Sequence, residues 1–427
     1  MNFLDEIIRA QKRGEGRGIA SICSAHPWVL RAVMSKTWQI SVTSQVLIEA
    51  TCNQVNQYGG YTGMKPVDFV QYVRKIVRES GFPAERVSLG GDHLGPSVWQ
   101  NEPAEVAMQK AEELVRGYVQ AGFVKIHLDA SMNLGDDSAG ALPVEVNAAR
   151  AARLVKAAEA ARVENLPAPC YVIGTEVPVP GGAQNHVEGL AVTTVDGVRE
   201  TLENTREAFQ REQVESAWER VIAVVVQPGV EFGDDFILDY QPEKAQSLAR
   251  FIEAEPELVY EAHSTDYQTR EALENLVRDH FAILKVGPAL TFAFREAVFA
   301  LAMMENELFP PIERSGSIGV LEAIMVRHHE HWRKYYRGTP EQQAFARKFS
   351  LSDRARYYWG RPEVQAALKR LIANLGARSI PLALLSQFAP AQYPRVRSGT
   401  LAATPEALIL DKVVDVLKDY HAATGVK

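Results

Sequence analysis

Along the first three quarters of the chain, short apolar runs rich in β-branched residues alternate with longer amphipathic stretches. Short apolar runs are typical of buried strands, and a period near 3.6 residues is typical of helices that cover them. We expect eight strands, at residues 18–24, 46–51, 86–90, 125–129, 171–175, 221–226, 258–261 and 282–286. We expect helices between them, including 103–120, 143–161, 198–209, 242–254 and 270–277.

This alternation predicts a parallel sheet, and eight such units predict an α/β fold of the (β/α)8 TIM-barrel type. A doubly wound open sheet is the competing architecture, but no glycine-rich dinucleotide fingerprint follows the first predicted strand. From about residue 310 the pattern becomes helical, with helices expected at 319–334, 340–349, 362–374 and 405–423. Because no flexible linker intervenes, we expect a barrel domain over 1–309 and an α-helical C-terminal extension over 310–427 packed on it.

Composition narrows the range of partners. The 427 residues include 53 Asp and Glu against 46 Lys and Arg, without a basic run, which argues against a nucleic-acid partner. The first residues include acidic side chains where a signal peptide has basic ones. No apolar stretch approaches the roughly 20 residues that a helix needs to cross a bilayer. We therefore expect a cytoplasmic protein without a membrane partner. Cys23, Cys52 and Cys170 share no metal-type spacing, and we expect them to be small buried residues.

Chemically active side chains gather where the predicted strands end. In a barrel these ends meet at one face, so the side chains should converge. The most informative pair is Asp92 and His93, because a neutral imidazole can hold a divalent metal and a neighbouring carboxylate can move a proton. The other residues at these positions are Glu49, Asn53, His127, Asp129, Glu176, Gln227, His263, Ser264, Asp266 and Lys285.

Each of these residues also has a structural interpretation. Asp92 and His93 could form a capped turn, His263 could be a hydrogen-bonded structural histidine, and Gln227 alone reads as a polar loop residue. For Lys285 we expect substrate binding or pairing with an anion, with a buried structural ion pair as the alternative. The cluster His328-His329-Glu330-His331 lies outside the predicted barrel, and we expect it to be a solvated helix face.

Several long segments make the chain resemble a known family. They are IEATCNQVNQYGGYTGM, LGGDHLGPSVWQ, KIHLDASM, YVIGTEVPVPGGAQ, VVVQPGVEF, EAHSTDYQT and ILKVGPALTF, followed by SLSDRARYYW and IPLALLSQFAP. With these segments the chain resembles the Z-type subunit of D-tagatose-1,6-bisphosphate aldolase over nearly its whole length. More loosely, it is similar to hexulose and hexuronate 4-epimerases and to the metal-dependent class II aldolases.

The resemblance to the 4-epimerases implies a divalent metal, namely zinc, manganese, cobalt or nickel. Carried over by motif, the ligands are His93, Gln227 and His263, and the catalytic acids are Asp92 and Glu176. In class II aldolases a histidine usually replaces the ligand at the position of Gln227, so the chain departs from that pattern. We expect the substrate to contact residues that surround this set, namely Glu49, Asn53, His127, Asp129, Ser264, Asp266 and Lys285.

These residues lead us to expect a ketohexose 4-epimerase that interconverts D-tagatose and D-fructose or their phosphates. The hydrogen on C4 of a 2-ketose is β to the carbonyl and too weakly acidic for simple proton exchange. Retro-aldol cleavage of the C3–C4 bond followed by recombination solves this problem, with Asp92 and Glu176 handling protons on opposite sides. The alternative is a noncatalytic Z subunit that stabilises a separate aldolase subunit. In either case we expect a ketohexose or ketohexose phosphate as ligand and a homo-oligomer.

Overall fold

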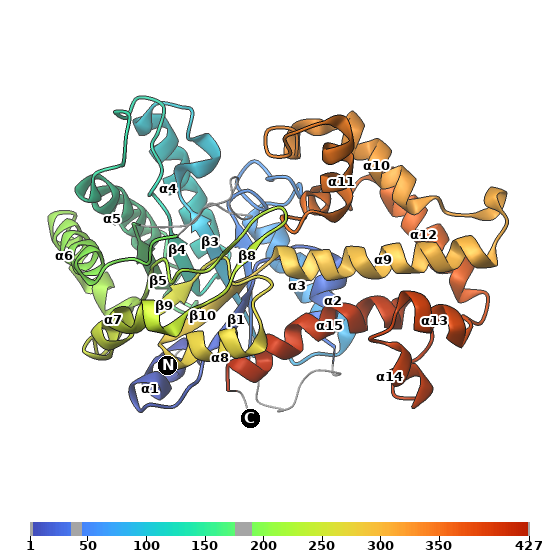
Figure 1. The fold of residues 1–427 in the computed structure, drawn as a ribbon. Helices are drawn as coiled ribbons and strands as arrows, with labels where there is room; N and C mark the ends of the chain where they lie inside the picture. Colours follow the sequence, from blue (N-terminus) through green and yellow to red (C-terminus); the bar gives the residue numbers. More distant parts are fainter. Residues whose placement is uncertain (1–2, 36–44, 176–189, 426–427) are drawn as a thin grey trace.

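Eight parallel strands close into a barrel, as the sequence predicts (Figure 1). The computed structural model describes residues 3–35, 45–175 and 190–425. Around the barrel the strands follow the order β1-β10-β9-β6-β5-β4-β3-β2, so the sheet is continuous and the doubly wound alternative is excluded. The strands are β1 Ile19–Ile22, β2 Val46–Thr51, β3 Val87–Leu94, β4 Lys125–Leu128, β5 Cys170–Gly174, β6 Val221–Val225, β9 Val259–Ala262 and β10 Phe281–Val286.

A helix follows each barrel strand, which is the pattern that right-handed crossovers between parallel strands require. All the helices expected between the strands are present. The helices of this part are α1 Phe3–Lys12, α2 Pro27–Val33, α3 Pro66–Ser80, α4 Ala104–Gln120, α5 Val144–Ala160, α6 Val195–Arg211, α7 Pro242–Glu253, α8 Arg270–Arg278 and α9 Pro288–Leu308. A short antiparallel pair that the sequence did not predict, β7 Glu231–Phe232 with β8 Ile237–Leu238, lies between β6 and α7.

The C-terminal part is helical and lies beside the barrel, where α9 and α15 run next to each other away from the strands (Figure 1). Helix α15 packs against α9, α8, α2 and β1, so the last helix of the chain covers barrel elements from both ends of the sequence. The division of the chain at residue 309 stays a prediction. The helices are α10 Ser317–Arg327, α11 Pro340–Phe349, α12 Pro362–Gly376, α13 Leu382–Phe388, α14 Tyr393–Arg397 and α15 Pro405–Ala423.

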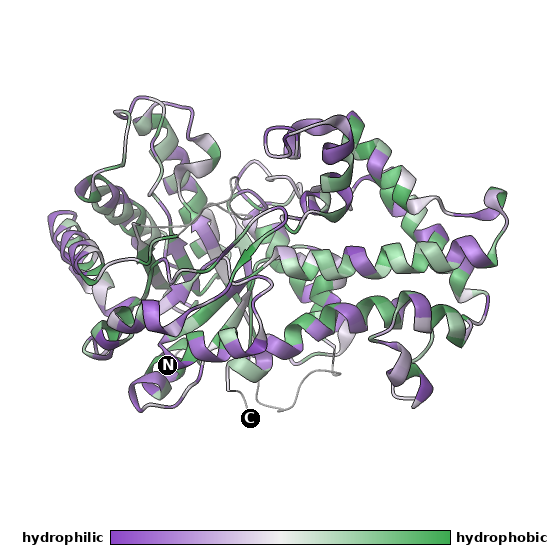
Figure 2. Ribbon diagram, in the orientation of Figure 1, coloured by the Kyte–Doolittle hydropathy of each residue, from purple (hydrophilic) through white to green (hydrophobic). Residues whose placement is uncertain are grey.

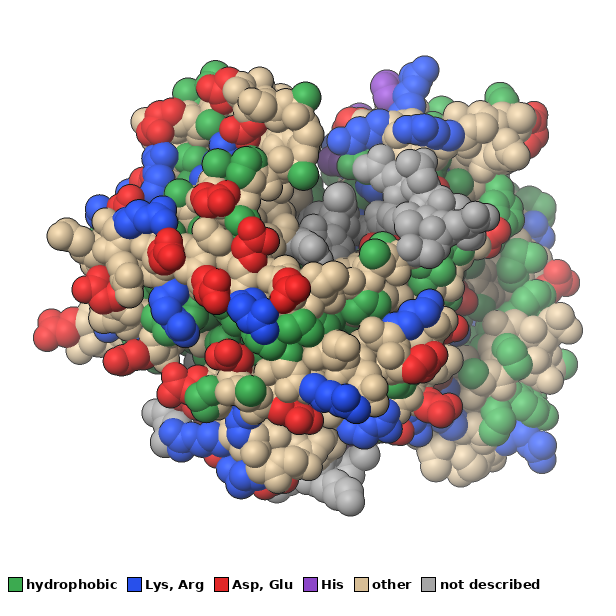
Figure 3. Space-filling model, turned by 60° about the vertical axis from the view of Figure 1, so that its left-hand side comes forward, with side chains coloured by type: hydrophobic (Ala, Val, Ile, Leu, Met, Phe, Trp, Pro, Cys, Tyr) green, Lys and Arg blue, Asp and Glu red, His purple; other side chains and the backbone are tan. Residues whose placement is uncertain are grey.

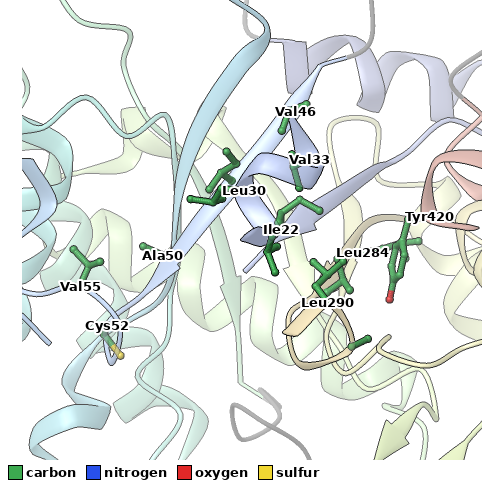
Figure 4. Close-up of a cluster of buried hydrophobic side chains, with 14 of the residues drawn as sticks. Ile22, Leu30, Val33, Val46, Ala50, Cys52, Val55, Leu284, Leu290 and Tyr420 are labelled. Carbon is green, nitrogen blue, oxygen red and sulfur yellow. The ribbon is translucent and has the colours of Figure 1, made fainter. Parts of the chain in front are cut away.

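The main apolar core joins the outer face of the strands to the surrounding helices. Figure 4 shows Ile22 of β1 and Leu284 of β10 near Leu30 and Val33 of α2, with Tyr420 of α15 on the other side. Helix α9 is apolar along much of its length, where α12 and α15 cover it (Figure 2). Burial of such faces is the main force that holds the extension against the barrel.

Acidic and basic side chains are interspersed over the face shown in Figure 3, without a large region of one sign. Within the described ranges, no helix combines the length and apolar character needed to cross a membrane.

Two sequence predictions need correction. The helix expected over 319–334 is α10, which already ends at Arg327, and a 3-10 turn at His329–His331 follows. The chain bends there because the Trp332 indole N–H donates to the Met325 carbonyl at 2.6 Å and the ring is buried. His331 is therefore not on a solvated helix face; its ring stacks on Tyr357 with centroids 4.7 Å apart.

The second correction concerns Cys23, which was expected to be buried. Cys52 and Cys170 are buried, but Cys23 is only partly buried and lies just after β1. Its thiol donates to Oδ2 of Asp92 at 3.4 Å, so it borders the centre described below.

Candidate active site and metal centre

An irregularity in β3 places Asp92 and His93. The β3–β4 pairing runs in register as far as Gly91 with Ile126 and resumes at Leu94 with Leu128, so Asp92 and His93 lie opposite His127 alone. Successive residues of a regular strand point to opposite faces, whereas an extra residue in one strand locally changes that alternation. The bulge therefore allows both side chains to take part in one buried centre.

The backbone at the strand ends is strained as well. His93 has φ +48° and Ser264 has φ +54°, in the left-handed region that costs a residue with a side chain about 1–2 kcal/mol. Strain of this kind persists only where surrounding contacts enforce it. Both residues line the same cavity, so the strained positions and the chemically active groups coincide.

Three histidines face one another in this centre, and each is backed by a carboxylate. The ring centroids of His93, His127 and His263 are 4.8–5.1 Å apart. Nδ1 of His93 is 2.7 Å from Oδ2 of Asp129, Nδ1 of His127 is 2.9 Å from Oδ1 of Asp92, and Nε2 of His263 is 3.0 Å from Oε1 of Glu261. A ring that donates one N–H to a carboxylate presents the other nitrogen as a lone pair, which is the usual arrangement behind metal-bound histidines and is open to His93 and His263. Nδ1 of His127 also receives the His93 backbone N–H at 3.2 Å.

A layer of buried ion pairs lies next to the histidines. Nζ of Lys125 is 2.6 Å from both Oε1 of Glu49 and Oε2 of Glu261. Nζ of Lys285 is 2.8 Å from Oδ1 of Asp92, and it also contacts Oε2 of Glu49. Lys285 therefore occupies a buried ion pair, the structural interpretation left open by the sequence, while its side chain also lines the cavity.

Glycines of the motif around Asp92 make room for this layer. A Cβ on Gly90 would lie 2.7 Å from Oε1 of Glu49, and a Cβ on Gly95 would lie 1.7 Å from the carbonyl oxygen of Asp129. Real Cβ atoms do not approach so closely, so any larger residue would displace Glu49 or the chain after β4. The Gly-Gly-Asp-His-Leu-Gly sequence is thus required by packing as well as by chemistry.

Electrostatics keep Asp92 charged and raise the pKa of His93. Burial alone would raise the pKa of the Asp92 carboxyl, but the Lys285 ammonium and His93 outweigh it and hold that pKa well below its usual range. Burial opposes protonation of His93, yet Asp92 and Asp129 together raise its pKa. At His263 burial dominates and lowers the pKa to about 3, so this ring is neutral. Asp92 is therefore ionised in the centre.

The charge balance fits a divalent cation. Two ammonium groups face four carboxylates, so with neutral imidazoles the centre carries a net charge of −2, from Lys125, Lys285, Asp92, Asp129, Glu49 and Glu261. One potential ligand atom from each of Asp92, His93, His127 and His263 lies within 4.8 Å of the others. Imidazole and carboxylate ligands suit zinc, manganese, cobalt and nickel. The residues present therefore fit a metal of the expected kind.

The structure gathers most of the residues singled out from the sequence. A cavity of about 80 Å³ at the mouth of the barrel is lined by seven of them, namely Asn53, Asp92, His93, His263, Ser264, Asp266 and Lys285. Asp266 is buried there, and burial raises its pKa to about 6 although the Ala289 and Gly287 N–H groups donate to it. Glu49, His127 and Asp129 lie behind this lining, where they hold Lys285, Asp92 and His93.

Two predicted residues are not placed in the centre. The amide oxygen of Gln227 accepts from the Gly229 N–H at 2.8 Å, and Gln227 is not among the residues that line the cavity. Among His, Cys, Asp and Glu side chains, His127 and Asp92 accompany His93 and His263, while a ligand role for Gln227 stays a prediction. Glu176 lies outside the described residues, so its expected role as the second acid stays a prediction.

Sequence reasoning missed Lys125 and Glu261 as members of the centre. Each lies two positions before a histidine, Lys125 before His127 on β4 and Glu261 on β9 before His263, which directly follows that strand. Residues i and i+2 of a strand share a face, so a charged residue two positions before a candidate ligand was the available signal. Arg356 and Tyr357 of the C-terminal part also line the cavity, and no sequence pattern connects them to strand ends.

Comparisons with known proteins agree with this picture. A family model described as D-tagatose-1,6-bisphosphate aldolase subunit GatZ/KbaZ-like matches residues 4–425. The chain is 54% identical over 419 residues to the D-tagatose-1,6-bisphosphate aldolase subunit GatZ of Klebsiella pneumoniae and to that of Salmonella typhimurium, covering 98% of each chain. A solved structure described as a probable tagatose 6 phosphate kinase from Sinorhizobium meliloti shares 46% identity, with a TM-score of 0.87 over 95% of this chain and 100% of that one. The chain therefore belongs to the GatZ/KbaZ-like family of D-tagatose-1,6-bisphosphate aldolase subunits.

Proposed function

We propose that the chain is a noncatalytic subunit of a D-tagatose-1,6-bisphosphate aldolase and stabilises a separate aldolase subunit. The observation that carries this proposal is the 54% identity to curated aldolase subunits over 98% of both chains. A protein that binds only the folded form of its partner stabilises it by mass action.

The buried centre supports a second candidate, a metal-dependent ketohexose 4-epimerase. A purely stabilising protein gains nothing from three carboxylate-backed histidines with an ionised aspartate, because buried polar networks are expensive to maintain. His93, His127 and His263, together with Asp92, would hold the ion. A bound divalent ion would supply Lewis-acid polarisation of the ketose carbonyl.

In this second candidate the chain's own residues move the protons. Asp92 takes the proton from the C4 hydroxyl while Lys285 keeps its carboxylate charged between turnovers. Glu176, on the segment after β5, serves as the second acid on the opposite side. The retro-aldol step then separates the fragments at C3–C4, and recombination on the other face of the aldehyde gives the epimer.

The two candidates are separated by one variant tested in two assays. His93→Asn removes an imidazole, and asparagine tolerates the positive φ at this position better than most residues do. The first assay measures the activity half-life and thermal midpoint of the separate aldolase subunit with and without this chain. The second measures C4 conversion of fructose, tagatose and their 6-phosphates by this chain alone, loaded with metal.

For the subunit we expect both the wild type and His93→Asn to prolong the activity of the aldolase equally, and the isolated chain to convert no ketose. For the epimerase we expect conversion by the wild type alone, lost with a chelator and reduced at least about 100-fold in His93→Asn. If the wild type neither stabilises the aldolase subunit nor binds to it, the subunit proposal is refuted.

A further inference from the structure

A larger cavity adjoins the centre between the barrel mouth and the C-terminal part. Its volume is about 690 Å³, and seven residues line both it and the smaller cavity, so the two are continuous. Among the shared residues are Gln54 and Tyr61 from the barrel loops and Arg356 and Tyr357 from the segment before α12. A ligand whose reactive end lies at His93 would therefore extend under the C-terminal part.

The charge of the two cavities differs. Asp92 and Asp266 line the smaller one together with the cations Lys285 and Arg356. The larger one is lined by Arg356 and Arg361 and by no carboxylate of the described ranges. Arg361 shares its charge with exposed Glu330 at 3.3 Å. In the described part of the chain, Arg356 has no carboxylate within ion-pair distance, so its charge remains available to a ligand.

The hydrogen bonds of Arg356 hold its guanidinium in place without using all its donors. Nη1 donates to the carbonyl oxygens of Ser352 and Asp353, and Nη2 donates to the Tyr357 hydroxyl at 3.0 Å. A guanidinium carries five N–H groups, so Nε–H and one N–H of Nη2 have no acceptor among the described residues. A fixed arginine with two spare donors is the kind of group that binds phosphate oxygens in a bidentate manner.

We propose that Arg356, assisted by Arg361, binds the phosphate of a phosphorylated ketohexose whose carbonyl end lies at the centre around Asp92 and His93. The phosphate is the one remote from the carbonyl, because the larger cavity is the one farther from the histidines. This inference goes beyond the stabilising role and rests on the second candidate function, in which the barrel binds a ketohexose. It assigns selection between free and phosphorylated sugars to the C-terminal part.

The test is calorimetric titration of the full chain with D-tagatose 6-phosphate, D-tagatose and inorganic phosphate. We expect the phosphorylated sugar to bind at least about tenfold more tightly than the free sugar, and Arg356→Gln to weaken only the phosphorylated sugar, by about 10- to 100-fold. Arg356→Lys keeps the positive charge but not the planar pair of donors. Its affinity for the phosphorylated sugar should lie between those of the wild type and Arg356→Gln. Arg337→Gln, an exposed arginine away from both cavities, is the matched control and should change neither affinity.

Equal affinity for both sugars, an equal loss for both in Arg356→Gln, or no binding of either would overturn the inference. Circular dichroism and a thermal midpoint for each variant show whether the fold is kept, and Arg361→Gln provides a second variant with a smaller selective loss. The titration contains no aldolase subunit. The titration therefore tests the phosphate subsite separately from the stabilising role, which is tested by the half-life and thermal midpoint of the aldolase subunit.

Discussion

Two lysine–carboxylate pairs of this protein show how differently the barrel centre and the C-terminal part use charge. Lys285 in the barrel contacts Asp92 and Glu49, and these side chains are at most 5% exposed. Lys412 on α15 is 3.1 Å from Glu296 on α9, with side chains 32% and 45% exposed. Removing one partner of an ion pair in the centre leaves a buried charge uncompensated and lowers the free energy of unfolding strongly. The exposed ion pairs on the extension contribute little to that free energy.

The largest effect is therefore expected for Lys285→Met. The variant leaves the Asp92 and Glu49 carboxylates buried near each other without their shared cation, which should cost about 3–5 kcal/mol of unfolding free energy. Urea unfolding followed by circular dichroism measures this. The matched control, Lys412→Met, should cost less than about 1 kcal/mol. Equal losses in the two variants would contradict the contrast.

The next effect concerns the pH dependence of stability. Burial raises the pKa of Asp266 to about 6 in the folded chain, above the usual value near 3.9 for an unfolded chain. The folded state thus holds this proton more tightly than the unfolded state does. The resulting contribution to the free energy of unfolding is fully present below about pH 4 and is lost as pH rises through about 6. Asp266→Asn has no carboxyl group at this position and does not lose this contribution. The free energy of unfolding of the variant relative to the wild type should therefore rise by up to about 3 kcal/mol between pH 4 and 7.

Urea midpoints at a series of pH values measure this difference. Asn can still accept the Gly287 and Ala289 N–H groups, so the start of α9 should be kept. The exposed variant Asp196→Asn is the control and should show no such trend. A difference between Asp266→Asn and wild type that stays constant over this pH range would show that the carboxyl is not protonated in the folded chain.

A smaller effect is expected where the two regions meet. The Tyr420 hydroxyl on α15 donates to the Thr265 carbonyl at 2.7 Å, just after β9. Tyr420→Phe keeps the ring and removes this bond, which should cost about 1 kcal/mol. Thermal unfolding measures the loss, and Tyr58→Phe, an exposed tyrosine, is the control. A loss near zero would show that this hydrogen bond does not help to hold α15 against the barrel.

The barrel could be predicted from the sequence because its strands are short apolar runs that end in polar residues. All eight strands overlap the predicted segments, and β2 has the predicted bounds. The gathering of Asp92, His93 and His263 followed from one rule, that parallel strands of a barrel end at the same face. Helix α10 was predicted too long because the residues after Arg327 remain compatible with a helix and only tertiary contacts of Trp332 bend the chain.

The remaining parts of the centre depend on contacts that periodicity cannot reveal. The pairing of Lys125 with Glu49 and Glu261 depends on inward-facing residues of three strands. The approach of Arg356 depends on how the extension folds back over the barrel mouth. Gln227 was carried over from a family pattern, and its amide is bonded within its own loop.

The position of α15 has a consequence for the synthesis of the protein. This helix, near the C-terminal end of the chain, covers β1, α2 and α8. While a ribosome makes the chain, the apolar surface of these early elements cannot receive its permanent cover until residue 423 has left the tunnel. The nascent chain should therefore keep this apolar surface exposed until α15 has emerged, and a chaperone would be needed most during this interval.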